Sequence, residues 1–231
     1  MMSSLVRKCK RRLFSLLSLG STIKIIIINL TTNLKNMFKI DSKFQDFSLE
    51  AYNPKTEEIE NISSDKLKGC WYILIFYPAD FTFVCPTELV DVNNRYEDFK
   101  KLNTEVIGVS TDTAHTHRGW IQMEELLHGL KYPLASDHTG NFSRELGILY
   151  EDSGKAQRAA FIVDPDGILR AADIVSDDIG RNASEILRKL KALDFVRKNP
   201  GKVCPASWDE GAPTLTPSIK LAGKVAGELK K

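Results

Sequence analysis

Apolar runs in the chain predict four strands. WYILIFY at residues 71–77 is uninterrupted and has the length of a strand buried on both faces. VIGVS at residues 106–110 predicts a second strand. Residues 158–163 and 168–175 predict two more strands, joined by the tight turn Asp164-Pro-Asp-Gly167.

Helical spacing of apolar positions alternates with these strands. Pro86 suits the first turn of a helix, and the pattern predicts that this helix continues to about Leu102. Further helices are expected at residues 113–127, 141–146 and 182–197. The side chains expected on the buried sides are Leu89, Val92, Tyr96, Phe99, Trp120, Met123, Leu127, Ile186, Leu187, Leu190, Leu193 and Phe195. This order predicts an α/β fold with one central mixed sheet flanked by helices.

The chain divides into three parts by pattern. Residues 37–199 are expected to form the domain, and residues 200–231, beyond the last helical pattern, an extended C-terminal tail. Residues 1–36 form an extension whose apolar runs are too short to span a bilayer. Its basic start, serines and lack of acidic residues are compatible with a secretory signal or a transit peptide. We expect this extension to lie outside the working protein.

Charge is distributed unevenly between these parts. The extension holds seven of the 32 basic residues and no acidic residue. The other 25 basic residues therefore stand against all 30 acidic residues, a net charge of −5 on residues 37–231. A mildly acidic domain is not expected to bind nucleic acid.

The four cysteines are widely spaced. Cys9, Cys70, Cys85 and Cys204 include no C-x-x-C pair, so neither a disulfide scaffold nor a zinc site is indicated. Cys85 and Cys204 each precede a proline, which singles them out. Cys70 is expected to be structural, and Cys9 in the extension to be incidental.

Cys85 lies between a buried strand and the start of a helix. The helix dipole and free N–H groups at such a position stabilise an anion, so a reactive thiolate at neutral pH is expected. Thr82 would place a hydroxyl near this sulfur, and Pro78 would shield it from water. Taken alone, the position is equally compatible with a buried, inert cysteine.

A longer motif distinguishes between these two interpretations. The pattern Pro78-x-x-x-Thr82-x-x-Cys85 and the run FYPADFTFVCPTEL resemble the typical 2-Cys peroxiredoxins, and in particular their bacterial AhpC type. The resemblance continues in VSTDTAHTHRGW, RAAFIVDPDG, GRNASEILRKLKAL and KVCPASW, and it covers about residues 38–225. It implies a thioredoxin-like fold and a thiol peroxidase that reduces hydrogen peroxide and organic hydroperoxides.

The resemblance also implies a role for individual residues. Cys85 would be the peroxidatic cysteine, oxidised to a sulfenic acid, and Cys204 the resolving cysteine that forms a disulfide with it. The remaining implied roles are Thr82 and Arg158 as donors to the peroxide and the thiolate, Pro78 as a shield, Glu88 and Arg181 as supports for Arg158, and Trp120 as a packing residue. No cofactor or metal is implied.

Partners and compartment follow from the same resemblance. It implies a homodimer whose Cys85–Cys204 pairs cross the interface, and a ring of five such dimers. The reductant would be a flavoprotein disulfide reductase or a thioredoxin-type protein. A cytoplasmic location is expected, with no membrane partner, although the extension leaves a targeted compartment open.

Three other functions are alternatives to the peroxidase. A holdase chaperone that binds unfolded proteins under peroxide stress is compatible with the sequence. A thioredoxin-like electron carrier would need a second cysteine where Thr82 stands. A cysteine protease would need His115 or His117 beside Cys85, although Arg158 and Thr82 already account for an activated thiolate.

Overall fold

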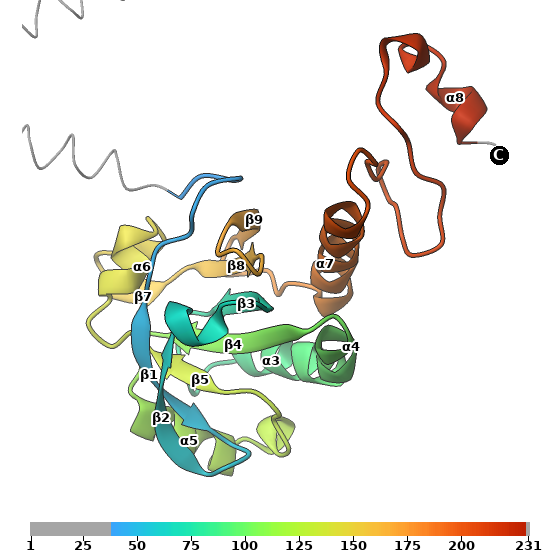
Figure 1. Cartoon of the computed structure of the whole chain (residues 1–231). Coiled ribbons are helices and arrows are strands. Elements are labelled where there is room, and N and C mark those ends of the chain that lie inside the picture. Colours follow the sequence, from blue (N-terminus) through green and yellow to red (C-terminus); the bar gives the residue numbers. More distant parts are fainter. Residues whose placement is uncertain (1–37, 230–231) are drawn as a thin grey trace, which may run out of the picture. The chain divides into compact units, whose positions relative to one another are not determined.

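A computed structural model describes residues 38–229, in which a seven-stranded mixed sheet is flanked by helices (Figure 1). The strand order is β2-β1-β5-β4-β3-β8-β9. β3 is parallel to β4 and β4 to β5, whereas the other neighbours are antiparallel. The strands are β1 Ser48–Asn53, β2 Glu58–Ser63, β3 Trp71–Phe76, β4 Thr104–Ser110, β5 Leu134–Ser136, β8 Arg158–Val163 and β9 Leu169–Val175. A small second sheet pairs β6 Leu149–Tyr150 with β7 Lys155–Ala156.

The central strand β3 separates two apolar cores. All six of its residues are buried. Because side chains alternate across a sheet, Trp71, Ile73 and Ile75 enter one core and Tyr72, Leu74 and Phe76 the other. Burial on both faces fixes the strand, and with it the start of the loop that leads to Cys85.

Helices cover both faces of the sheet. Those that pack on the Trp71 side are α3 Cys85–Asn94, α4 Tyr96–Lys101, α5 Ala114–Met123 and α7 Ala183–Lys198. On the other side, α6 (Asn141–Glu145) inserts Phe142. The α5 and α7 helices start at side-chain caps, Thr113 and Asn182. No helix within residues 38–229 is long and apolar enough to cross a membrane.

Most elements expected from the sequence are confirmed. The strands predicted at residues 71–77, 158–163 and 168–175 are β3, β8 and β9, and the run at residues 106–110 lies in β4. The helices predicted at residues 141–146 and 182–197 are α6 and α7. The α/β class with a central mixed sheet is also as predicted.

The single helix expected from Pro86 to Leu102 is wrong. It breaks at Arg95 (φ −104°, ψ 5°) into α3 and α4. The reason lies in Asn93, whose side chain donates to the Gly129 carbonyl and accepts from the Lys131 N–H. Asparagine is a weak helix former, so the pair Asn93-Asn94 favours an end of α3 at this point.

The helix expected at residues 113–127 is also too long. It ends at Met123, because Glu124 is extended and its carboxylate accepts from the Leu126 N–H to cap the 3₁₀ turn η3, Glu125–Leu127. Leu127 remains buried, as expected. Met123, which was expected inside, is 74% exposed, since the change of direction turns it outward.

The sequence pattern missed the β1–β2 hairpin, the three-residue strand β5 and the β6–β7 pair. β2 is mostly exposed and polar, so it carries little apolar alternation. The tail is not wholly extended: Val203 pairs with Leu215, followed by η4 (Ile219–Leu221) and α8 (Val225–Glu228). The predictions for residues 1–36 and for Cys9 lie outside the described residues.

The different positions of Leu127 and Met123 predict different costs of truncation. Leu127→Ala should lower the free energy of unfolding by about 2–5 kcal/mol, because it leaves a cavity in the core. Met123→Ala should change it by less than about 0.5 kcal/mol. Urea unfolding of both variants measures this, and equal losses would show that Met123 is buried after all.

Candidate active site

Cys85 is the first residue of α3 and is fully buried. The loop from Pro78 to Val84 brings it back from the end of β3, and Pro86 occupies the first helical turn. Arg158, the first residue of β8, lies beside it: Arg158 Nη1 donates to Cys85 Sγ at 3.4 Å. A strand of the sheet thus carries a cation to the sulfur at the helix start.

Glu88, one turn along α3, holds this arginine in place. Arg158 Nη1 also donates to Glu88 Oε2 at 2.6 Å, and Arg158 Nε donates to the Asp177 carbonyl at 2.8 Å. Arg181 reaches the same carboxylate from the loop before α7, with Nε 2.7 Å from Oε1 and Nη2 3.1 Å from Oε2. The Arg181 backbone N–H donates to Glu88 Oε1 as well.

The charges of this cluster do not cancel. Two buried guanidinium groups surround one carboxylate, so one positive charge remains beside Cys85. Burial would raise the pKa of Glu88, but the hydrogen bonds and charge of Arg181, aided by Arg158, hold it below its usual value. Burial would lower the pKa of Arg158, yet Cys85 and Glu88 raise it. Glu88 and Arg158 thus each stabilise the charged form of the other.

The loop before Cys85 presents the other expected residues. Pro78 is buried directly after β3. The Thr82 hydroxyl donates to the Ala79 carbonyl at 2.8 Å, and no hydrogen bond within residues 38–229 joins Thr82 to Cys85. Thr82 therefore lies in the expected segment, but its hydroxyl fixes the loop. Phe81 adopts a left-handed backbone (φ 53°) in this loop.

A second buried polar cluster supports the same loop. Asp80 accepts from Tyr77 Oη at 2.9 Å and lies 2.7 Å from His117 Nδ1, while His117 Nε2 lies 3.2 Å from the Ala135 carbonyl. Burial raises the pKa of Asp80, although the His117 bond opposes this. Both ring nitrogens of His117 face oxygens, so the ring is held between the Asp80 carboxylate and the Ala135 carbonyl. The loop is thereby anchored to α5 and β5.

Sequence reasoning missed Asp80 and considered His117 only as a partner of Cys85. The structure pairs His117 with Asp80 instead, and His115 is exposed, so within residues 38–229 neither histidine hydrogen-bonds to Cys85. The sequence did contain a signal for this pair. Asp80 is an acidic residue in the motif loop, and His117 lies one helical turn before Trp120, which was expected to face inward. Trp120 is buried as expected, against Tyr77 and Phe81.

The structure does not bring Cys204 to Cys85 within the chain. Both thiols are free, and Cys204 Sγ, partly buried, faces the Ala192 carbonyl of α7 at 3.8 Å. Burial raises the pKa of Cys204, against the smaller effect of Arg188. Cys204 is therefore held as a protonated thiol away from the cationic cluster.

The arrangement around Cys85 is suited to thiolate chemistry. Fixed cationic donors next to a buried sulfur can stabilise charge that develops on a substrate oxygen. Within the part of the chain that the structure describes, no group of three or more histidine, cysteine or acidic side chains is placed to bind a metal. The residues gathered at the site are the Cys85 thiol, the two arginines and the glutamate that both arginines share.

Comparisons with known proteins show which family the chain resembles. A family model described as the AhpC/TSA family matches residues 40–172. Alkyl hydroperoxide reductase C of Staphylococcus aureus is 44% identical over 189 residues, which cover 82% of this chain and 100% of the relative.

Solved structures include similar chains. AhpC of Enterococcus faecalis superposes with a TM-score of 0.69 at 43% identity, over 73% of this chain and 100% of that one. The reduced 2-Cys peroxiredoxin of Plasmodium vivax superposes with a TM-score of 0.77 at 30% identity, over 82% of this chain and 99% of that one. The fold is therefore thioredoxin-like, as expected.

Replacement of Glu88 tests the electrostatic design of the cluster. Glu88→Gln should lower the free energy of unfolding at pH 7 by about 3–5 kcal/mol, because two buried guanidinium groups lose their counter-charge. Glu97→Gln, which removes the exposed pair with Lys131, is the matched control and should leave the urea midpoint close to that of the wild type.

The effect has a defined pH dependence. Since the pKa of Glu88 is lower in the folded than in the unfolded state, its contribution is complete above the unfolded value, about 4.5, and is lost as pH falls through the lowered value. The stability difference between wild type and Glu88→Gln should therefore shrink only at strongly acidic pH. A difference that disappears already near pH 6 would contradict this charge assignment.

Proposed function

The chain belongs to the AhpC/TSA family and is a peroxiredoxin, and we propose that it reduces hydrogen peroxide and organic hydroperoxides with Cys85 as the peroxidatic and Cys204 as the resolving cysteine. The observation that carries the proposal is the hydrogen bond from Arg158 Nη1 to Cys85 Sγ. It places a fixed positive charge at the sulfur that has to act as a nucleophile.

The first step is an attack by the Cys85 thiolate on the terminal peroxide oxygen. A sulfur–oxygen bond forms, the oxygen–oxygen bond breaks, and the leaving oxygen takes a proton to give water or an alcohol. Cys85 is oxidised to the sulfenic acid and the peroxide is reduced. Arg158 donates to the oxygens as negative charge moves onto them, which lowers the barrier.

Positioning residues prepare this step. Glu88 and Arg181 fix the plane of the Arg158 guanidinium, because the carboxylate is shared between both arginines. Pro78 and Trp120 exclude water on the loop side of the site. Thr82, whose hydroxyl bonds to the Ala79 carbonyl, keeps its oxygen lone pairs and can turn its proton to the bound peroxide.

The second step is condensation of the sulfenic acid with a thiol. Cys204 of the partner subunit would attack the oxidised sulfur, so that a disulfide forms and water leaves. The separate position of Cys204 on its own chain supports a bond between subunits. Cys85 is fully buried, so the start of α3 has to open locally for the two sulfurs to meet.

An external dithiol then returns the enzyme to its reduced form. A flavoprotein disulfide reductase or a thioredoxin-type protein is the proposed donor, because either supplies two electrons to a disulfide. We place the reaction in the cytoplasm, in a homodimer that assembles into a ring of five dimers. A holdase activity under peroxide stress is the alternative, and it would not require Cys85.

Two cysteine variants separate the steps. Cys85→Ser should abolish peroxide turnover, because among residues 38–229 no other thiol hydrogen-bonds to Arg158. Cys204→Ser should still consume one equivalent of peroxide in a burst and then accumulate sulfenic acid, seen with a sulfenic-acid trap. Cys70→Ser is the matched control and should turn over like the wild type, since Cys70 lies outside the site. If Cys204→Ser reacts as slowly as Cys85→Ser, the assigned roles are wrong. A protein that is only a chaperone would keep its activity in Cys85→Ser.

The oxidised protein should be a covalent dimer. After one equivalent of peroxide, a non-reducing gel is expected to show a band of twice the chain mass that disappears in both Cys85→Ser and Cys204→Ser. Mass spectrometry of this band should recover a peptide linking Cys85 to Cys204. An oxidised monomer with both thiols consumed would contradict the intersubunit bond.

A further inference from the structure

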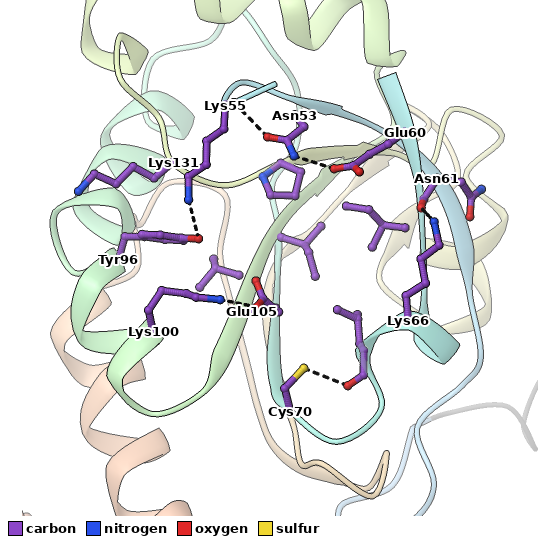
Figure 2. Close-up of a pocket in the computed structure, with 15 residues that line it drawn as sticks. Asn53, Lys55, Glu60, Asn61, Lys66, Cys70, Tyr96, Lys100, Glu105 and Lys131 are labelled. Carbon is purple, nitrogen blue, oxygen red and sulfur yellow. Dashed lines mark hydrogen bonds and ion pairs between the residues drawn. The ribbon is translucent and has the colours of Figure 1, made fainter. Parts of the chain in front are cut away.

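A second site lies at the other end of the central strands. A pocket of about 480 Å³ opens beside the amino-terminal residues of β3 and β4, where Cys70 and Glu105 line it (Figure 2). Its other walls come from β2, the 3₁₀ turn η2 (Ser64–Leu67) and α4. Cys85 follows the opposite end of β3, so this pocket is separate from the peroxidase site. Its volume lies in the range of pockets that hold small organic molecules.

Two lysines on its rim lack a carboxylate partner. Lys55 Nζ donates to Tyr96 Oη at 3.0 Å and lies 4.4 Å from the centre of that ring. Lys66 Nζ donates to the Asn61 carbonyl at 2.6 Å. Among residues 38–229, neither ammonium group has an acidic side chain within ion-pair distance. Neutral acceptors thus hold both lysines in place, although the charge of Lys55 also reaches Glu97 and helps to lower the pKa of that carboxylate.

The other charged groups of the lining are largely satisfied. Lys100 forms an ion pair with Glu105, and Lys131 pairs with Glu97 outside the lining. Glu60 accepts from the Asn53 side-chain amide at 2.7 Å. The lining contains four lysines and two glutamates, and with Glu97, the partner of Lys131, these groups keep an excess of one positive charge. An occupant would therefore be anionic.

The floor of the pocket between the two lysines is aliphatic. Ile62, Leu67, Val106, Ile107 and Pro133 line it, and Figure 2 shows Lys55 and Lys66 on opposite sides. The one aromatic ring of the lining, Tyr96, has Lys55 over it and stacks on Tyr132, with centroids 6.3 Å apart. A planar base has no ring face to stack on, whereas a flexible hydrocarbon chain can cover the floor.

We infer that this pocket binds a small aliphatic dianion, with a hydrocarbon segment on the floor and one anionic group at each of Lys55 and Lys66. The apolar floor and the two separated cations match the two chemical parts of such a molecule. Because both ammonium groups are already held by neighbours, binding costs little side-chain ordering. The inference does not depend on the peroxidase mechanism.

Cys70 provides a reporter inside the pocket. Its thiol donates to the Leu67 carbonyl at 3.1 Å and is partly exposed. Burial, and then Glu105, raise the pKa of this thiol. Cys70 is therefore a slow thiol whose rate of alkylation will report whether the pocket is occupied.

Suberate is the probe for this site. Saturation-transfer NMR on the full-length reduced protein should show suberate binding, with octanoate weaker and both 1,8-octanediol and 1,8-diaminooctane without signal. At suberate concentrations about tenfold above the dissociation constant, alkylation of Cys70, located by fragment mass spectrometry, should slow about tenfold, because only the free fraction reacts. Alkylation of Cys204 should not change.

Variants of the two lysines test the location. Lys55→Met with Lys66→Met should weaken suberate binding at least about tenfold, since two charged contacts are lost. Lys155→Met, an exposed lysine on β7, is the matched control and should bind like the wild type. The inference is overturned if suberate does not bind, if the diamine or the diol binds equally well, or if the double variant retains wild-type affinity. Peroxide turnover is not part of this test, so its outcome is independent of the proposed function.

Discussion

The carboxylate of Glu88, shared between two buried arginines, is the interaction on which the active site depends. An arginine side chain has many rotamers, and Arg158 alone would not keep Nη1 at the sulfur. The Glu88 carboxylate accepts from Arg158 Nη1, and Arg181 in turn donates to that carboxylate, so each group of the cluster is held by its neighbour. The excess positive charge of this cluster then lies where an anionic sulfur and a peroxide oxygen have to be stabilised.

The fold stabilises this buried charged cluster by bringing together three segments that are far apart in the sequence. Cys85 and Glu88 come from α3, Arg158 from β8 and Arg181 from the loop before α7. Burying a charged group lowers the stability of the fold unless the group is paired and hydrogen-bonded. In this cluster the three charged groups are paired only when all three segments are in place. Asp91 adds a further link by accepting from the Ala183 N–H, so that α7 is tied to α3. The same contacts that build the site also hold the helices on the sheet.

The sequence predicted those parts of the fold that depend on long, regular patterns. β3 and β8, buried on both faces, and the long amphipathic helix α7 were evident for this reason. The pattern did not predict the helix break at Arg95 or the end of α5 at Met123. The break depends on contacts of the Asn93 side chain, and the turn after Met123 depends on the capping carboxylate of Glu124. Individual polar bonds decided both, one between distant segments and one within the turn, and helical periodicity does not record either.

The residues of the site were indicated by the family motifs in the sequence and not by the spacing of apolar positions. The resemblance named Cys85, Glu88, Arg158 and Arg181 together, and the structure places them in one hydrogen-bonded cluster. It did not indicate that Asp80 and His117 anchor the loop, since a pair 37 residues apart becomes visible only when α5 packs against that loop. Nor did it indicate that the Thr82 hydroxyl bonds to the Ala79 carbonyl.

The rate at which peroxide oxidises Cys85 tests the central claim most directly. Rapid mixing of reduced protein with peroxide, followed by trapping of the sulfenic acid, measures this oxidation step separately from disulfide formation with Cys204 and from reduction by an external dithiol. Arg158→Met should slow it about 100-fold to 1,000-fold, the usual effect of removing one fixed donor from a developing charge. Arg144→Met, which removes an exposed arginine paired with Glu151, is the control and should react like the wild type. Equal rates in Arg158→Met and the control would contradict the account.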